Sequence, residues 1–197
     1  MSKNLSALVH VVDDDEDLGE AVVRLLIRHG YQAESFVAPE MMLDACARQE
    51  CQCVVTDIMM GEMDGFALAD ALRARNPAVA IIFMTAWPTT ANAVDAVRRY
   101  GGLDYLEKPI DEARLLAAIA EGVAWSRRRG AALIRMDRLT ARERQVLNLL
   151  AAGMSNKRVA ASLELSTKTV EDHRAAVMAK TGTSSIADLI ALVRDAQ

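Results

Sequence analysis

Hydrophobic and polar positions divide the chain into two parts. In the first 110 residues, short apolar runs alternate with stretches in which apolar residues recur every three or four positions. The runs predict strands over residues 8–12, 32–36, 53–56, 80–84 and 103–106. The periodic stretches predict helices over residues 16–29, from Pro39 onward, and over 66–75, 90–100 and 111–124. This alternation predicts an α/β fold, a doubly wound five-stranded parallel sheet with helices on both faces.

No strand pattern follows residue 125. The run Arg127-Arg128-Arg129-Gly130 breaks the composition, and Thr140 with Glu143 forms a capping box at a helix start. Further helices are expected at residues 155–163, 166–180 and 185–195, and the short connection between the first two is typical of a helix-turn-helix. We therefore expect an α/β domain at residues 1–125, a linker at 126–138 and a small all-α domain at 139–197.

Charge follows the same division. The 197 residues are 52% hydrophobic and 25% charged with a net charge of −4, which excludes a disordered chain and by itself argues against a nucleic-acid partner. Residues 1–125, however, hold 10 Lys and Arg against 20 Asp and Glu, whereas residues 126–197 hold 13 against 7. An acidic part joined to a basic part indicates two functions.

Neither a membrane nor an oxidising compartment is indicated. The longest apolar run, residues 78–84, is far shorter than the roughly 18 residues that a membrane span requires. Cys46, Cys51 and Cys53 form an odd set with no histidine near them in the sequence, whereas a zinc site requires four ligands. We expect reduced thiols in a cytoplasmic protein without a membrane partner.

Acidic and other polar residues stand where the predicted strands end. Asp13 and Asp14 follow the first strand, Asp57 the third, Thr85 the fourth and Lys108 the fifth. Strand ends of a parallel sheet meet at one edge, where ligands bind. Clustered carboxylates suit Mg²⁺, and the whole set suits a phosphoryl group, with an aspartate as nucleophile. The alternative to a ligand site is that these acidic residues cap the helices that follow, where the positive end of the helix dipole favours carboxylates. We favour that alternative only for the neighbouring Asp15 and Glu16.

Four motifs in order resemble the signature of a bacterial response-regulator receiver domain over about residues 6–123. They are Val12-Asp13-Asp14, the run from Asp57 to Gly65, Thr85-Ala86, and the run from Asp104 to Pro109. The resemblance implies that Asp57 accepts phosphate from a sensor histidine kinase. It also implies that Asp14, Asp57 and the Met59 carbonyl bind Mg²⁺ directly, and that Asp13 acts mostly through water. Thr85 and Tyr105 resemble the switch pair, Lys108 contacts the phosphoryl group, and Lys108-Pro109 matches a pattern with a cis bond.

The sequence departs from the family pattern in two ways. One concerns the loop after Asp57, and the other concerns the residues that control hydrolysis of the phosphoryl group. Gly61 stands where the family usually has proline, which predicts a more flexible loop after Asp57. Met59 and Trp87, two residues beyond Asp57 and Thr85, are apolar and cannot orient an attacking water. We therefore expect slow self-dephosphorylation.

The basic part resembles the LuxR-type helix-turn-helix of FixJ/NarL response regulators over residues 139–193. The carrying residues are Leu139-Thr140, Arg142-Glu143, Gln145-Val146-Leu147, Gly153, Ser155-Asn156-Lys157, Leu165-Ser166, Thr169-Val170-Glu171, His173-Arg174, Val177-Met178, Lys180 and Gly182. The second helix of such a unit enters the major groove. We expect the bases to be faced by Lys168, Thr169, Glu171, Asp172 and Ala175. Phosphate contacts are expected from Asn156, Lys157, Thr167, His173, Arg174 and Lys180.

Two acids on this second helix leave alternatives open. Glu171 and Asp172 could accept from cytosine N4 and so specify a base. Asp172 could instead lie along the helix toward Ala175 and Ala176, or pair with Arg174 or Lys168. The apolar positions Val159, Leu163, Val170 and Val177 are expected to be core.

Together these features predict a transcription regulator, not an enzyme. Phosphorylation of Asp57 is expected to switch homodimerisation and sequence-specific binding of double-stranded DNA, with RNA polymerase as a further possible partner. One rival is a Mg²⁺ phosphatase with an aspartate nucleophile, although its D-x-D-x-T/V pattern is missing from residues 13–17. The other rival is a kinase-coupled protein whose helical part binds protein instead of DNA.

Overall fold

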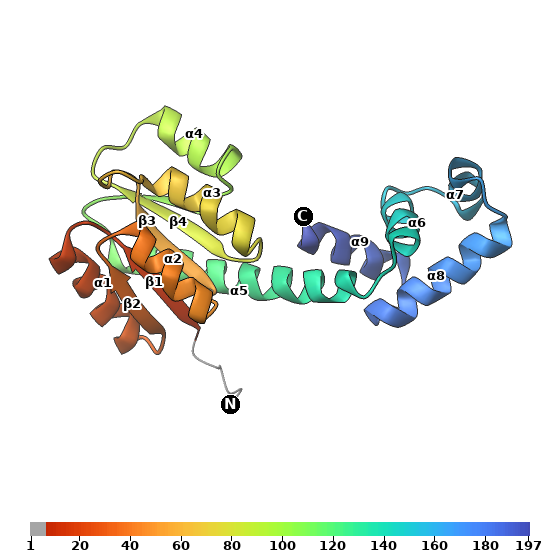
Figure 1. Ribbon diagram of the computed structural model, residues 1–197, viewed down its shortest axis with the longest axis horizontal. Coiled ribbons are helices and arrows are strands. Elements are labelled where there is room, and N and C mark those ends of the chain that lie inside the picture. Colours follow the sequence, from red (N-terminus) through yellow and green to blue (C-terminus); the bar gives the residue numbers. More distant parts are fainter. Residues whose placement is uncertain (1–6) are drawn as a thin grey trace. The chain divides into compact units, whose positions relative to one another are not determined.

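The structure, a computed structural model, describes residues 7–197 and divides the chain into two compact units, Met1–Arg127 and Arg128–Gln197 (Figure 1). The first unit is built on one parallel sheet with strand order β2-β1-β3-β4-β5. Its strands are β1 (Leu8–Val12), β2 (Gln32–Phe36), β3 (Cys53–Asp57), β4 (Ala80–Thr85) and β5 (Asp104–Glu107). The predicted fold class is therefore confirmed. β3 and β4 each run one residue beyond the predicted range, so that Asp57 and Thr85 are the last residues of their strands.

Helices cover both faces of this sheet. They are α1 (Glu16–Arg28), α2 (Pro39–Arg48), α3 (Gly65–Arg75), α4 (Thr90–Arg98) and α5 (Glu112–Asp137). One buried cluster joins α2, α3 and α4 to the sheet through residues such as Met42, Leu68 and Ala96. The other joins α1 and α5 to the opposite face through residues such as Leu26 and Ile119. Because β3 and β4 are buried on both faces, their sequences are continuous apolar runs until the polar residues at their ends.

Helix α5 differs from the prediction. The sequence predicts that it ends at residue 124 and that residues 126–138 form a linker, but α5 continues to Asp137. Arginine, alanine, leucine and methionine dominate this stretch and favour helix, and a single glycine such as Gly130 weakens a helix by only about 1 kcal/mol relative to alanine. The division between the two units falls inside this helix, after Arg127.

Short helices with two buried clusters form the second unit. They are α6 (Ala141–Ala151), α7 (Asn156–Leu163), α8 (Thr167–Thr181) and α9 (Ile186–Ala196). Val159, Val170 and Val177 are fully buried, as the apolar pattern predicts. Leu163 is partly buried and packs against the cluster that contains Val159 and Val170. No single helix within residues 7–197 is long and apolar enough to cross a membrane, and α8 with α9 meets that test only as a pair bent by 63°.

Candidate functional site

The polar residues that end the strands converge at the carboxyl edge of the sheet. β1 lies between β2 and β3, and β4 lies between β3 and β5, so the residues after neighbouring parallel strands emerge side by side. Asp57 and Thr85 close β3 and β4, while Asp13 and Lys108 directly follow β1 and β5. The predicted clustering of these residue types thus follows from the strand order.

Lys108 joins two of the carboxylates. Its Nζ donates to Asp13 Oδ2 and to Asp57 Oδ2, both at 2.7 Å. The side chains of all three residues are largely buried: 14% of Lys108, 9% of Asp57 and none of Asp13 is exposed. At this burial the two ion pairs are screened far less than surface pairs, so they hold the Asp57 carboxylate in place.

Burial and charge oppose each other in this group. Burial raises the pKa of Asp13 above its usual range, although the hydrogen bonds from Lys108 and from the backbone of Asp15 act to lower it. Burial acts to lower the pKa of Lys108, but the hydrogen bonds and charges of Asp13 and Asp57 outweigh it and raise that pKa. Lys108 is therefore a fixed positive charge beside Asp57 at neutral pH.

Three carboxylates meet the requirements of a hard cation. Carboxylate oxygens of Asp13, Asp14 and Asp57 lie within 4.8 Å of one another, and Asp14 is exposed. Oxygen donors that leave room for water are what Mg²⁺ prefers. The Met59 N–H donates to Asp57 Oδ1 at 3.2 Å, and the Met59 side chain is exposed. The metal-ligand role expected of the Met59 carbonyl stays a prediction.

Two hydroxyl groups lie on the β4 and β5 side of this edge. Thr85 is fully buried, and its Oγ1 accepts from the Trp87 N–H at 3.1 Å, which leaves the hydroxyl hydrogen available for donation. The Tyr105 hydroxyl is buried and has no hydrogen-bond partner among the described residues. Such an orphan group destabilises a fold by about 1–3 kcal/mol, although the rest of the Tyr105 side chain packs against the buried cluster of α2, α3 and α4. The Lys108-Pro109 bond is cis, as predicted.

Helices α7 and α8 form the predicted helix-turn-helix in the second unit. Ser155 and Ser166 cap their N-termini, and Glu164 ends α7 in the left-handed region with φ of 54°. Most of the residues expected to contact DNA lie on the surface. Lys157, Thr167, Lys168, Glu171, Asp172, Ala175 and Lys180 are exposed, while Asn156, Thr169, His173 and Arg174 are partly buried. These DNA contacts stay predictions.

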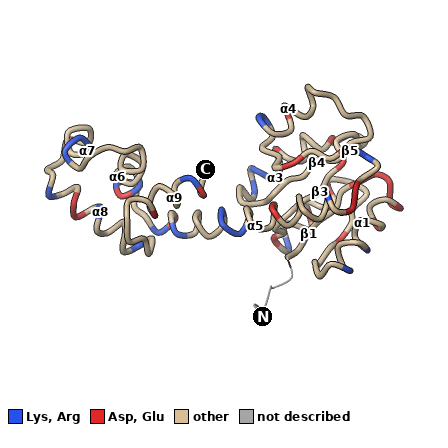
Figure 2. The backbone as a smooth tube through the Cα atoms, turned by 180° about the vertical axis from the view of Figure 1, so that it is seen from behind, with Lys and Arg blue, Asp and Glu red and all other residues tan. Residues whose placement is uncertain are grey.

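Three charged residues that were expected to contact DNA, Lys168, Asp172 and Lys180, form ion pairs within the second unit. Lys168 Nζ lies 3.1 Å from Asp172 Oδ1, which is one of the pairings left open for Asp172. α8 therefore carries a neutral surface pair next to the exposed Glu171. Acidic and basic positions both occur along the backbone of α8 (Figure 2). Lys180 Nζ donates to the buried Glu143 Oε2 at 2.7 Å. This bond and the capping-box hydrogen bond from the Thr140 N–H hold the pKa of Glu143 below its usual range. The Lys180 ammonium is thus engaged within its own unit.

One cluster was missed by the sequence argument. Cys46 and Cys51 have no histidine close to them in the sequence, but the structure places His10 Nδ1 3.5 Å from Cys46 Sγ. His10, which is 36 residues from Cys46 along the chain, therefore lies beside the cysteines in the fold, where the sequence predicted no ligand cluster. Alternation along β1 turns His10 toward the face covered by α2, and no local sequence signal carries that information.

Comparisons with known proteins agree for both units. The response regulator receiver domain model matches residues 9–120, and the model of bacterial regulatory proteins of the luxR family matches residues 137–193. The chain is 35% identical over 189 residues to the transcriptional regulatory protein FixJ of Azorhizobium caulinodans, covering 92% of this chain and 89% of FixJ. The chain belongs to the response regulators with a LuxR-type DNA-binding domain.

Two solved structures of response regulators support this assignment. Response regulator StyR is 34% identical with a TM-score of 0.56, covering 95% of this chain and 98% of StyR. Full-length FixJ from B. japonicum is 31% identical with a TM-score of 0.54, covering 96% of this chain and 97% of FixJ. The response regulator is accordingly a transcription regulator and not an enzyme, which removes the phosphatase alternative.

Proposed function

We propose that Asp57 of this response regulator accepts a phosphoryl group from a sensor histidine kinase in the cytoplasm. The observation that carries the proposal is the position of Lys108, whose ammonium bridges Asp57 and Asp13 at 2.7 Å each. Met59 N–H holds the other Asp57 oxygen at 3.2 Å. Asp57 is thereby held as an oriented carboxylate nucleophile at the open edge of the sheet.

The proposed transfer uses groups that are already in position. An Asp57 carboxylate oxygen attacks the phosphorus of a phosphohistidine, the new O–P bond forms as the P–N bond breaks, and the imidazole leaves with the electron pair. Lys108 neutralises charge on the phosphoryl oxygens. Thr85 donates its hydroxyl hydrogen to one of them, because its oxygen already accepts from the Trp87 N–H.

Mg²⁺ is the proposed cofactor. Asp14, Asp57 and the Met59 carbonyl are the proposed direct ligands, and Asp13 is proposed to act mostly through water. When bound, Mg²⁺ neutralises negative charge on the phosphoryl oxygens. The exposed Asp14 beside the buried Asp13 supports this division, since Asp14 faces solvent and Lys108 already engages Asp13.

Thr85 and Tyr105 form the proposed switch. Donation from Thr85 to the phosphoryl group draws the end of β4 toward Asp57, and Tyr105 on the adjoining β5 moves with it. The unpartnered Tyr105 hydroxyl supports this role, since no hydrogen bond among the described residues has to break when the side chain moves. The surface of α4 and β5 then changes, which either promotes a homodimer or releases the DNA-binding part.

In this proposal the DNA-binding part occupies residues 139–197, the receiver residues 1–125, and residues 126–138 connect them. α8 enters the major groove of double-stranded DNA, and the groups at the start of α7 and along α8 contact phosphates. Two half-sites bound by a homodimer raise operator affinity through effective concentration. RNA polymerase is the partner through which bound regulator changes transcription.

Operator selection followed by a salt titration tests the DNA half. We expect the phosphorylated chain to enrich one half-site motif from random duplexes, and its binding constant for that motif to fall steeply as salt rises, because phosphate contacts release counterions. Absence of salt-dependent binding to any duplex favours the rival in which the helical part binds protein, and salt-dependent binding without enrichment contradicts the sequence-specific part of the proposal.

We also expect the phosphorylated chain to lose its phosphoryl group slowly. Met59 and Trp87 flank the site with exposed fractions of 61% and 74%, and neither side chain can hold an attacking water. Decay in the presence of Mg²⁺, followed on phosphate-affinity gels, should take minutes or longer. Met59→Asn, which adds a polar group at the same exposed position, should shorten the lifetime several-fold. Complete loss of the phosphoryl group from the natural chain within seconds would contradict the prediction of slow self-dephosphorylation.

A further inference from the structure

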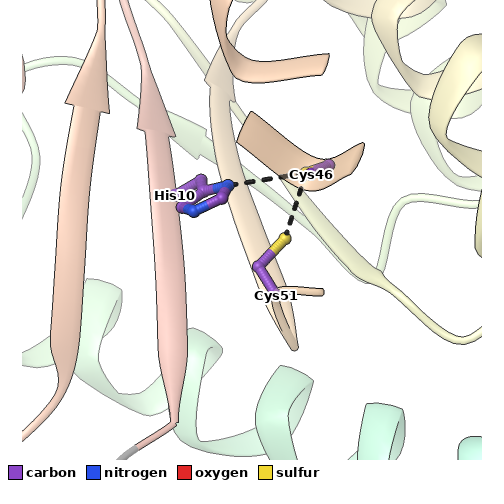
Figure 3. A group of neighbouring side chains, drawn as sticks. All are labelled: His10, Cys46 and Cys51. Carbon is purple, nitrogen blue, oxygen red and sulfur yellow. Dashed lines mark hydrogen bonds between the residues drawn. The ribbon is translucent and has the colours of Figure 1, made fainter. Parts of the chain in front are cut away.

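His10, Cys46 and Cys51 converge inside the receiver unit, away from the strand ends that carry Asp57. His10 lies on β1, Cys46 on α2 and Cys51 just before β3, and the three side chains point toward one another (Figure 3). His10 and Cys51 are buried, with 2% and 3% exposed, and Cys46 is partly buried. Nothing in the proposed phosphoryl transfer uses these groups.

The spacing of the ligand atoms matches a coordination shell. Cys46 Sγ lies 3.7 Å from Cys51 Sγ and 3.5 Å from His10 Nδ1, and all three ligand atoms lie within 4.8 Å of one another. With metal–sulfur bonds of ~2.3 Å and metal–nitrogen bonds of ~2.0–2.1 Å, tetrahedral edges are about 3.8 Å for S···S and about 3.6 Å for S···N. The Cys46–Cys51 and Cys46–His10 separations equal these edges to within about 0.1 Å.

We propose that His10, Cys46 and Cys51 form a second metal site that binds a thiophilic cation, Cu⁺ or Zn²⁺. Within residues 7–197 no further His, Cys, Asp or Glu joins this cluster. The soft thioether of the buried Met42 lies beside the cluster, with its Sδ 3.3 Å from Cys46 Sγ. This separation is shorter than the ~3.8 Å tetrahedral edge, so Met42 must move outward to become a fourth ligand. Two thiolates, one imidazole and one thioether suit Cu⁺ better than Zn²⁺, which takes thiolate sulfur, imidazole nitrogen or carboxylate oxygen.

Metal binding displaces the thiol protons of this cluster. Cys46 donates its S–H to Met42 Sδ, and its sulfur lies within hydrogen-bond distance of Cys51 Sγ and His10 Nδ1. Both cysteine thiols give up a proton to solvent when the metal–sulfur bonds form. A cavity of about 220 Å³ is lined by both cysteines together with Glu50, Arg75 and Asn76 and gives room for an ion to reach the sulfur atoms. The Arg75 guanidinium opposes the charge of a cation there, and the Glu50 carboxylate favours it.

Competition with chromophoric chelators tests the proposal on the full chain, reduced and kept under anaerobic conditions. One arm uses Cu⁺ with bicinchoninate, and the other uses Zn²⁺ with a colorimetric zinc chelator. We expect one Cu⁺ ion per chain and a shift of the competition curve by at least about tenfold between the natural chain and Cys46→Ser. Stoichiometric uptake of Zn²⁺ with the same sensitivity to Cys46→Ser also supports the site and assigns it to zinc.

Cys53→Ala is the matched control, because Cys53 is equally buried but packs on the opposite face of the sheet. It should bind as the natural chain does. Phosphorylation of Asp57 by phosphoramidate shows that each variant is folded, and a Cys51→Ala variant provides a second ligand deletion. The proposal is overturned if neither ion binds the natural chain more tightly than Cys46→Ser and Cys51→Ala, or if Cys53→Ala weakens binding equally.

Discussion

Asp57→Asn will leave the response regulator unable to take up a phosphoryl group. The amide lacks the carboxylate nucleophile, yet its oxygen can still accept from Lys108 Nζ, so the fold should persist. With phosphoramidate and Mg²⁺ we expect one phosphoryl group on the natural chain by intact mass. The variant should react at least ~10³-fold more slowly, as expected when the nucleophile of a preorganised site is removed.

Asp15→Asn is the matched control for this result. Asp15 belongs to the same acidic run but caps α1 by accepting from the Leu18 N–H at 3.1 Å, and asparagine caps a helix equally well. The control should be phosphorylated at the natural rate. Phosphoryl uptake by Asp57→Asn at a rate near that of the control would assign the acceptor role to another carboxylate.

Gly65→Ala will destabilise the receiver unit and slow phosphorylation together. Gly65 begins α3 and donates its N–H to the Ile58 carbonyl at 3.0 Å. A Cβ at this position would collide with the backbone carbonyl oxygen of Asp57 and meet Ile58 Cα at 3.0 Å. β3 pairs with strands on both sides and cannot retreat, so overpacking should lower the free energy of unfolding by about 1–3 kcal/mol. Any residual shift displaces Asp57, the proposed phosphate acceptor.

Urea unfolding followed by tryptophan fluorescence measures this effect, because the two tryptophans, Trp87 and Trp125, both lie in the first unit. Gly61→Ala is the control. A Cβ at Gly61 meets no heavy atom within 4 Å, so alanine should leave stability unchanged or raise it by about 0.4–1 kcal/mol. Equal urea midpoints for Gly65→Ala and the natural chain would contradict this prediction and would show that β3 moves at Asp57 to make room for the added Cβ.

The site at the sheet edge was open to sequence reasoning because strand position determines it. Buried parallel strands read as apolar runs, and a polar residue at the end of each run marks the carboxyl edge. The ends of neighbouring strands then lie side by side, and the sequences of the helices between them do not change this. The strand pattern alone predicts that Asp57 and Thr85 lie at this edge, and the motif resemblance adds the separate role expected of each.

Side-chain contacts between elements far apart in the sequence could not be predicted from hydrophobic periodicity and strand order. The pairing of Lys180 with Glu143 joins α8 to α6, and the meeting of His10 with Cys46 joins β1 to α2. Both depend on how helices pack, which periodicity does not specify. The end of α5 was misjudged for a different reason: charge and a single glycine resembled a linker, although helix propensity through Arg135 favoured continuation.

The central claim, that phosphorylation of Asp57 controls assembly and DNA binding, is tested most directly by solution mass and operator affinity measured together. Sedimentation and fluorescence anisotropy would be recorded on the natural chain and on Asp57→Asn, each with and without phosphoramidate and Mg²⁺. Phosphorylation should convert the natural chain to a dimer and raise its operator affinity by about 10²-fold or more through effective concentration, and Asp57→Asn should respond in neither measurement. A natural chain that is fully phosphorylated yet unchanged in both mass and affinity would contradict the account.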